Sequence, residues 1–118
     1  MRNFTLFENI DASVQQISGA KNLERHTEWV LRINASGLDG IPQLFVEEGF
    51  NGGKCLPEPT EWSVVPYKCD ETGTFEITES EVNIRSKQFL ANWFRVRLEP
   101  NGNTTGIISV ILSYKDYT

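Results

Sequence analysis

The fold is decided by the stretch from Trp93 to Tyr114, which reads WFRVRLEPNGNTTGIISVILSY. Alternate side chains in its first and last parts are apolar: Phe94, Val96 and Leu98, then Ile108, Val110, Leu112 and Tyr114. A period of two is that of a β-strand with one buried face. The residues between these parts, Pro-Asn-Gly-Asn at 100–103, favour a turn. We therefore expect two strands separated by a turn at this end of the chain.

The same alternation recurs upstream. It is clearest at Trp29, Leu31, Ile33 and Ala35. Shorter versions occur at 4–6, 44–46, 62–65, 74–78 and 82–84, with turn-forming clusters between them at 36–40, 51–53 and 70–73. Short strands at such regular spacing indicate an all-β protein. We expect one antiparallel β-sandwich domain over residues 1–118, of about eight strands in a jelly-roll-like order, with short helices at 20–25 and 86–92.

Composition and charge narrow the choice of partners. The 118 residues, 39% hydrophobic and 23% charged, suit one globular domain with a single core. A formal net charge of −5 disfavours nucleic acid and anionic membranes as partners. The N-terminus, Met1 to Leu6, lacks the apolar run of a signal peptide, so we expect a soluble chain made in the cytosol. The glycosylation sequons at Asn3, Asn34 and Asn103 are then expected to be accidental.

Residues able to carry catalysis or hold a metal are few. His26 is the one histidine, and no Gly-x-Ser-x-Gly elbow accompanies it, which argues against a serine or cysteine hydrolase. Structural zinc needs four closely spaced ligands, whereas Cys55, Cys69 and His26 supply three with none closely paired. We expect no catalytic residue, no metal and no cofactor. The two cysteines are expected to be reduced, and a disulfide between them is the alternative in an oxidising compartment.

Acidic residues gather in pairs such as Glu47 and Glu48, which raises calcium binding or glycoside hydrolysis as alternatives. Neighbouring residues of a strand point to opposite faces, so these two carboxylates do not converge on one site. No segment matches the Asp-rich calcium-binding loop. We expect solvated charges at sheet edges and turns, and a protein that is not an enzyme.

The three tryptophans raise the possibility of a platform on which sugar rings stack. Trp29 shares a face with aliphatic side chains and Trp62 precedes two valines, so both are expected in the core. Trp93 is expected to be exposed, on one face with Arg95 and Arg97. This face has two interpretations: a glycan contact surface, or a structural cation–π contact between Trp93 and Arg95.

The order of several segments carries a resemblance. FVEEGFNGG at 45–53 is followed by EW at 61–62, GTFEI at 73–77, WFRVRL at 93–98 and TGIISVILS at 105–113. Between Gln43 and Lys115 this order resembles that of small β-sandwich virion proteins of tailed bacteriophages. The resemblance implies a non-enzymatic capsid decoration or auxiliary protein, assembled in the host cytoplasm, that binds the outer surface of the major capsid shell. Other virion proteins and further copies of the chain are the remaining partners it implies.

The chain departs from that pattern where an extra loop precedes Trp62, and this loop is the expected interface. It contains Cys55, Leu56, Pro57 and Pro59. The two prolines fix φ and so lower the entropy cost of ordering the loop against a partner. At the end of the chain, Asp116 and Tyr117 are expected to reach neighbouring subunits.

Two alternative functions remain open at this point. One is a carbohydrate-binding β-sandwich module of a tail or capsid appendage, with the face of Trp93, Arg95 and Arg97 as its glycan surface. The other is a neck or tail connector, which differs from decoration chiefly in the number of copies per particle.

Overall fold

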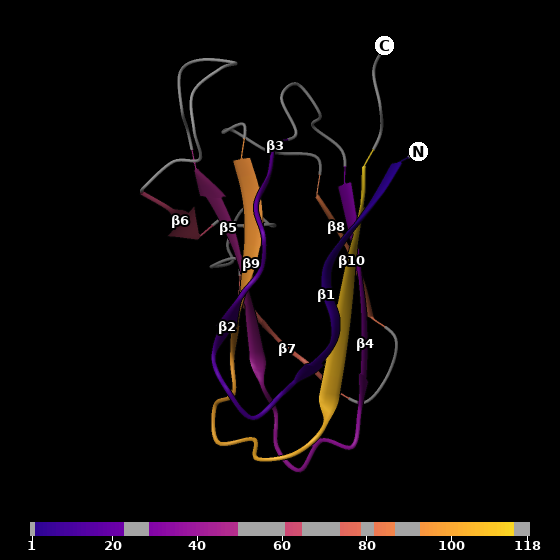
Figure 1. Ribbon diagram of the computed structural model, residues 1–118, viewed down its shortest axis with the longest axis vertical. Helices are drawn as coiled ribbons and strands as arrows, with labels where there is room; N and C mark the ends of the chain where they lie inside the picture. The colour runs from indigo at the N-terminus through magenta and orange to yellow at the C-terminus, as the bar shows by residue number, and fades with distance from the viewer. Residues whose placement is uncertain are drawn as a thin grey trace.

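The computed structural model describes residues 2–22, 29–49, 61–64, 74–78, 82–86 and 93–114, and this part of the chain is all-β (Figure 1). Its ten strands are β1 (Arg2–Asp11), β2 (Gln16–Ile17), β3 (Lys21–Asn22), β4 (Trp29–Ser36), β5 (Gln43–Gly49), β6 (Ser63–Val64), β7 (Thr74–Glu76), β8 (Val82–Ser86), β9 (Trp93–Glu99) and β10 (Ile107–Tyr114). None of the described residues forms a helix long and apolar enough to cross a membrane.

The strands form two antiparallel sheets (Figure 1). Sheet A has the order β1-β10-β4-β8, and sheet B has the order β2-β9-β5-β6. In sheet B, β3 also pairs with β9, and β7 also pairs with β5. Each edge of sheet B is therefore built from two short strands that follow one another along the same central strand. The all-β class and the antiparallel pairing expected from the sequence are confirmed.

One hydrophobic core draws on both sheets. The inward positions of β9 and β10 anticipated by the alternation are fully buried: Phe94, Val96, Leu98, Ile108, Val110 and Leu112. Trp29 of β4 is 2% exposed, and its ring meets that of Phe94 edge to face, with 5.0 Å between centroids. Because β4 belongs to sheet A and β9 to sheet B, this aromatic contact joins the two sheets, and such a pair adds about 1 kcal/mol beyond its buried area.

The expectation of short helices is wrong where the structure tests it. Lys21 and Asn22 form β3 against β9, and Ser86 is the last residue of β8. Pairing with a long neighbouring strand satisfies backbone groups that one helical turn would leave unpaired. The other residues of 20–25 and 86–92 are a coil residue, Ala20, and positions outside the described residues.

Three loops that cross from one sheet to the other are fastened together at one end of the molecule, the lower end in Figure 1. Asn103, in the β9–β10 loop, is 2% exposed. Its side-chain oxygen accepts hydrogen bonds from the backbone N–H groups of Asp39 and Gly40, at 3.0 and 2.9 Å. Its amide nitrogen donates to the carbonyl oxygens of Ala12 and Thr105, at 3.0 and 2.7 Å. We call this arrangement the Asn103 clasp.

A second layer of contacts surrounds the clasp. The carboxylate of Asp39 accepts hydrogen bonds from the hydroxyl and the backbone N–H of Thr104, and these bonds lower the pKa of Asp39. Gly106 has φ +104, and a Cβ there would lie 2.7 Å from the carbonyl oxygen of Ser36. Only glycine fits this close approach of two loops.

Candidate functional site

The face singled out in the sequence lies on the side of sheet B that is turned away from the core. Along β9, Trp93, Arg95 and Arg97 alternate with the buried Phe94, Val96 and Leu98, and each of the three is half-buried. The sequence therefore identified the correct side of the strand. It overestimated the exposure of Trp93, whose indole Nε1 is buried and has no hydrogen-bond partner among the described residues.

A buried carboxylate organises this face. Glu47 stands opposite Arg95 in the β5–β9 register and is 6% exposed. Its Oε1 accepts a hydrogen bond from Nε of Arg95 at 2.9 Å, and its Oε2 accepts one from Nε of Arg97 at 3.4 Å. Arg97 also donates to Glu99, which in turn accepts a hydrogen bond from Gln15. Glu47 is thus held between two cations, and the expectation that it is a solvated charge is wrong.

Aromatic rings complete the face. The guanidinium carbon of Arg95 lies 4.1 Å from the centroid of the Trp62 ring, and that of Arg97 lies 4.2 Å from the centroid of the Phe45 ring. A cation–π contact was expected from the sequence, but its aromatic partner is Trp62 and not Trp93. Trp62 is half-buried and lies at the surface, so the expectation that it belongs to the core is wrong. We call Phe45, Glu47, Trp62, Trp93, Arg95 and Arg97 the sheet B face.

This packing limits what the sheet B face can do. A sugar platform needs ring faces open to solvent, whereas the Trp62 and Phe45 rings each have one face covered by a guanidinium group. Both arginines are held by Glu47 and by a ring at once, so their positions are fixed before any partner arrives. One face of each ring is therefore taken by a guanidinium group and is not open to stack against a sugar.

The other predicted interface residues, Cys55, Leu56, Pro57, Pro59, Asp116 and Tyr117, lie outside the described residues, as do Cys69 and His26. In the sequence, Cys55 falls between β5 and β6, and both strands belong to sheet B. In the part of the chain that the structure describes, no three His, Cys, Asp or Glu residues gather in a group able to hold a metal.

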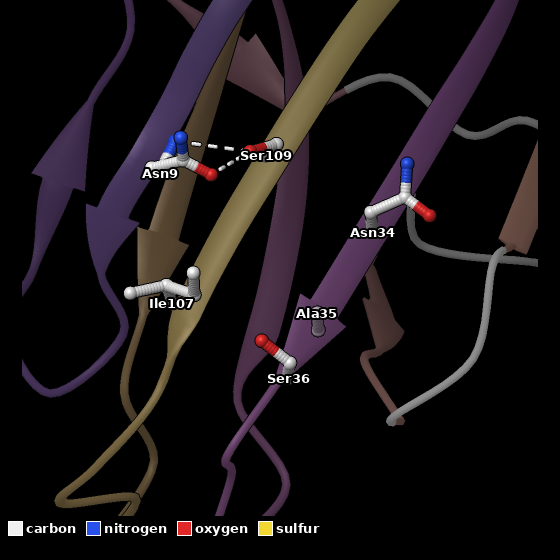
Figure 2. A pocket seen from close by; sticks show the side chains of 6 residues that line it. All are labelled: Asn9, Asn34, Ala35, Ser36, Ile107 and Ser109. Atoms are coloured by element: carbon white, nitrogen blue, oxygen red, sulfur yellow. Dashed lines mark hydrogen bonds between the residues drawn. The ribbon is translucent and has the colours of Figure 1, made fainter.

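A second feature lies on the outer side of sheet A. There a hollow of about 280 Å³ is lined by Asn9, Asn34, Ala35, Ser36, Ile107 and Ser109 (Figure 2). In the β10–β4 register, Ser109 stands opposite Asn34 and Ile107 stands opposite Ser36. The hollow is therefore built from two cross-strand pairs at the ends of β4 and β10, with Asn9 of β1 beside them. We call it the sheet A hollow.

Asn9 reaches the sheet A hollow because β1 bulges. Between the pairs Phe7–Val110 and Ile10–Ile108, β1 has one residue more than β10, and Asn9 takes φ 48. Asn tolerates this left-handed conformation better than most residues. Its backbone N–H donates to Oγ of Ser109 at 2.9 Å, and the Ser109 hydroxyl donates to Oδ1 of Asn9 at 3.1 Å (Figure 2).

Sequence reasoning missed both Glu47 and the sheet A hollow. The signal for Glu47 was its place on one face with Phe45, two positions along a strand with apolar Leu44 and Val46 on the opposite face. The signal for the bulge at Asn9 was broken alternation, since Phe7 is buried and Ile10, three positions along the strand, packs against the same core. Two core-facing residues three positions apart need an extra residue between them, and Asn9 is the residue suited to it.

Comparison of the chain with protein-family models, with curated proteins and with solved structures gives no significant match.

Proposed function

We propose that the chain is a jelly-roll β-sandwich that serves as a non-enzymatic structural protein of a phage virion, binding the outer surface of the major capsid shell as a decoration protein. The observation that carries the contact function is the sheet B face, where tryptophan, phenylalanine and arginine side chains are held rigid around Glu47. The class of partner comes from the resemblance to phage virion proteins.

The strand order supports the jelly roll. If β2 with β3, and β6 with β7, each count as one interrupted strand, the chain has eight strand positions. The first then pairs with the eighth, the second with the seventh, the third with the sixth and the fourth with the fifth. This is the pairing of a long hairpin rolled into two four-stranded sheets, the architecture of many capsid and lectin domains.

The chemistry of the sheet B face supports a protein partner. Trp, Phe and Arg are enriched at the centres of protein interfaces, and Trp and Arg are the commonest residues whose truncation weakens binding. The two arginines of the face are paired with Glu47 and, beside the face, with Glu99, so little charge is left for a partner to compensate. Because Glu47 and the two rings already fix the arginines, little side-chain entropy remains to be lost on docking.

The first experiment is a peptide inventory, by quantitative mass spectrometry, of purified particles of the phage that encodes the chain. Copy numbers comparable with the major shell protein are expected. A number on the scale of a dozen or so would indicate a neck or tail connector, and absence from the particle would contradict the virion role.

The second experiment tests the sheet B face with shells that lack the protein. In co-sedimentation, Arg95→Ala is expected to weaken binding at least about tenfold, as truncation of a central interface arginine does. Arg32→Ala is the matched control, because Arg32 is an exposed arginine on the outer side of sheet A. Equal binding of the Arg95 and Arg32 variants would exclude the sheet B face as the docking surface. Circular dichroism melts show that both variants are folded before binding is compared.

A further inference from the structure

The sheet A hollow has the chemistry of a binding site for a small neutral ligand. The described side chains that line it carry no charge: two asparagines, two serines, an alanine and an isoleucine (Figure 2). Its volume of about 280 Å³ lies just under the roughly 300–1,000 Å³ of pockets that hold drug-sized molecules. A ligand of a single ring is the size that such a hollow takes.

Several polar groups in the hollow are available to a ligand. The side chains of Asn34 and Ser36 are exposed on adjacent outward positions of β4, and the described residues offer them no hydrogen-bond partner. Asn9 uses its amide oxygen to accept from Ser109, which leaves its two amide N–H donors free. The hollow thus presents amide donors, an amide acceptor and a hydroxyl within one surface patch.

One apolar side chain completes the hollow. Ile107 is 45% exposed although it is a large aliphatic residue, and it stands across the strand pair from Ser36. Sugar rings carry hydroxyl groups that both donate and accept at their rim, and C–H groups on their faces. Amides and a hydroxyl around an exposed aliphatic side chain match that combination, whereas a charged ligand would find no counter-ion among the lining residues.

We propose that the sheet A hollow binds one neutral hexose unit, with Asn34 and Ser36 as hydrogen-bonding residues, Asn9 as a further donor and Ile107 as the apolar contact. The proposal is independent of the proposed virion function, since it concerns the opposite sheet from the sheet B face. In a particle that displayed the protein with sheet B docked, the sheet A hollow would point away from the shell.

The test is a titration of the isotope-labelled protein with glucose, galactose, mannose and N-acetylglucosamine, followed by two-dimensional amide NMR. With at least one sugar, the backbone signals of Asn34, Ser36 and Ser109 are expected to shift and saturate, with a dissociation constant on the order of 1–10 mM. No saturable shift up to about 50 mM with any of the four would overturn the proposal. So would saturable shifts confined to the sheet B face.

Substitutions in the sheet A hollow test whether the sugar binds there. Asn34→Ala is expected to weaken the sugar about fivefold, the effect of one lost hydrogen bond. Asn3→Ala is the control, because Asn3 is another exposed asparagine of sheet A, on β1, and its side-chain oxygen accepts a 2.6 Å hydrogen bond from Ser113 at a distance from the hollow. The control is expected to bind as the parent does. An unchanged affinity in Asn34→Ala would overturn the proposal.

A comparison of a charged sugar with a neutral one tests the expected preference for neutral ligands. Glucuronic acid is expected to bind more weakly than glucose, because no cation lines the sheet A hollow. Tighter binding of the acid would overturn the neutral specificity and point to Arg32, which lies on the same side of β4 as Asn34.

Discussion

The outer sides of the two sheets follow the same alternation but have opposite chemistry. The sheet B face carries long side chains that cover one another: two arginines lie over two aromatic rings and share one buried carboxylate. The outer side of sheet A, where β4 ends and β10 begins, carries Asn34, Ser36 and Ser109, which are too short to cover the hollow between them. One face is filled and rigid, and the other is open.

The two faces therefore suit different kinds of contact. A filled face of fixed aromatic and guanidinium groups offers a broad surface to another protein. An open face of short polar groups offers hydrogen bonds to a small molecule that enters it. Both properties arise from the length of the outward-facing side chains. The core constrains the inward-facing residues of each strand and does not constrain the length of the outward-facing ones.

The largest expected effect comes from Asn103→Ala, which breaks the fastening that holds the two faces in their relative positions. The change removes four hydrogen bonds and leaves one buried and three partly buried backbone groups, from three crossing loops, without these partners. A loss of about 3 kcal/mol in the free energy of unfolding is expected, measured by urea denaturation.

A control for that loss lies in the same turn. Asn101 is exposed, has φ 49 and donates one 3.1 Å hydrogen bond to the carbonyl of Ile41. Asn101→Gly keeps a residue that accepts positive φ, and it should cost less than about 1 kcal/mol. If the two variants were equally stable, the Asn103 clasp would have no special role.

The next largest effect is expected from a change in the sheet B face alone. Glu47→Gln replaces the buried carboxylate by an amide that cannot neutralise Arg95 and Arg97, and the free energy of unfolding is expected to fall by about 2 kcal/mol. Glu99→Gln is the matched control: Glu99 is bonded to Arg97 but more exposed, so its loss should cost about 0.5 kcal/mol. Chemical denaturation of both variants distinguishes a central role for Glu47 from a general effect of removing acids.

Glu47→Gln is also expected to affect the two proposed binding functions differently. With its arginines released, the sheet B face should bind capsid shells less well, while the sheet A hollow should bind a hexose as before. Loss of both activities would mean that the two faces are not independent.

Much of the architecture follows from the sequence. Period-two patterns identified β4, β9 and β10 and their buried sides, because the core-facing residues of a sheet are apolar whichever strand lies beside them. The short strands β2 and β3 were harder to predict: two residues such as Lys21 and Asn22 show no period, and only their pairing with β9 makes them strands. Their structure is determined by a distant partner and not by local preference.

The candidate sites were only partly predictable for a related reason. Alternation placed Trp93, Arg95 and Arg97 on one side of β9. It could not show that Arg95 would lie over the ring of Trp62, the residue just before β6. That contact depends on which strands are neighbours in sheet B. The sheet A hollow joins residues of β1, β4 and β10, and no pattern within a single segment reveals such a meeting.

The smallest expected effect is a pH dependence at the Asn103 clasp. The hydroxyl of Thr104, and then its backbone N–H, hold the pKa of Asp39 below the ordinary 3.8. Since the folded state favours the ionised carboxylate, its contribution is complete above the ordinary pKa and is lost as the pH falls through the lowered value. The melting temperature of the parent protein should therefore exceed that of Asp39→Asn at pH 6, and the difference should shrink between pH 4 and pH 2. In Thr104→Val, which lacks the hydroxyl, adding Asp39→Asn should change the melting temperature less. A difference that stayed constant down to pH 2 would show that the two hydrogen bonds do not favour the charged form of Asp39, and that this end of the molecule is held by the Asn103 clasp alone.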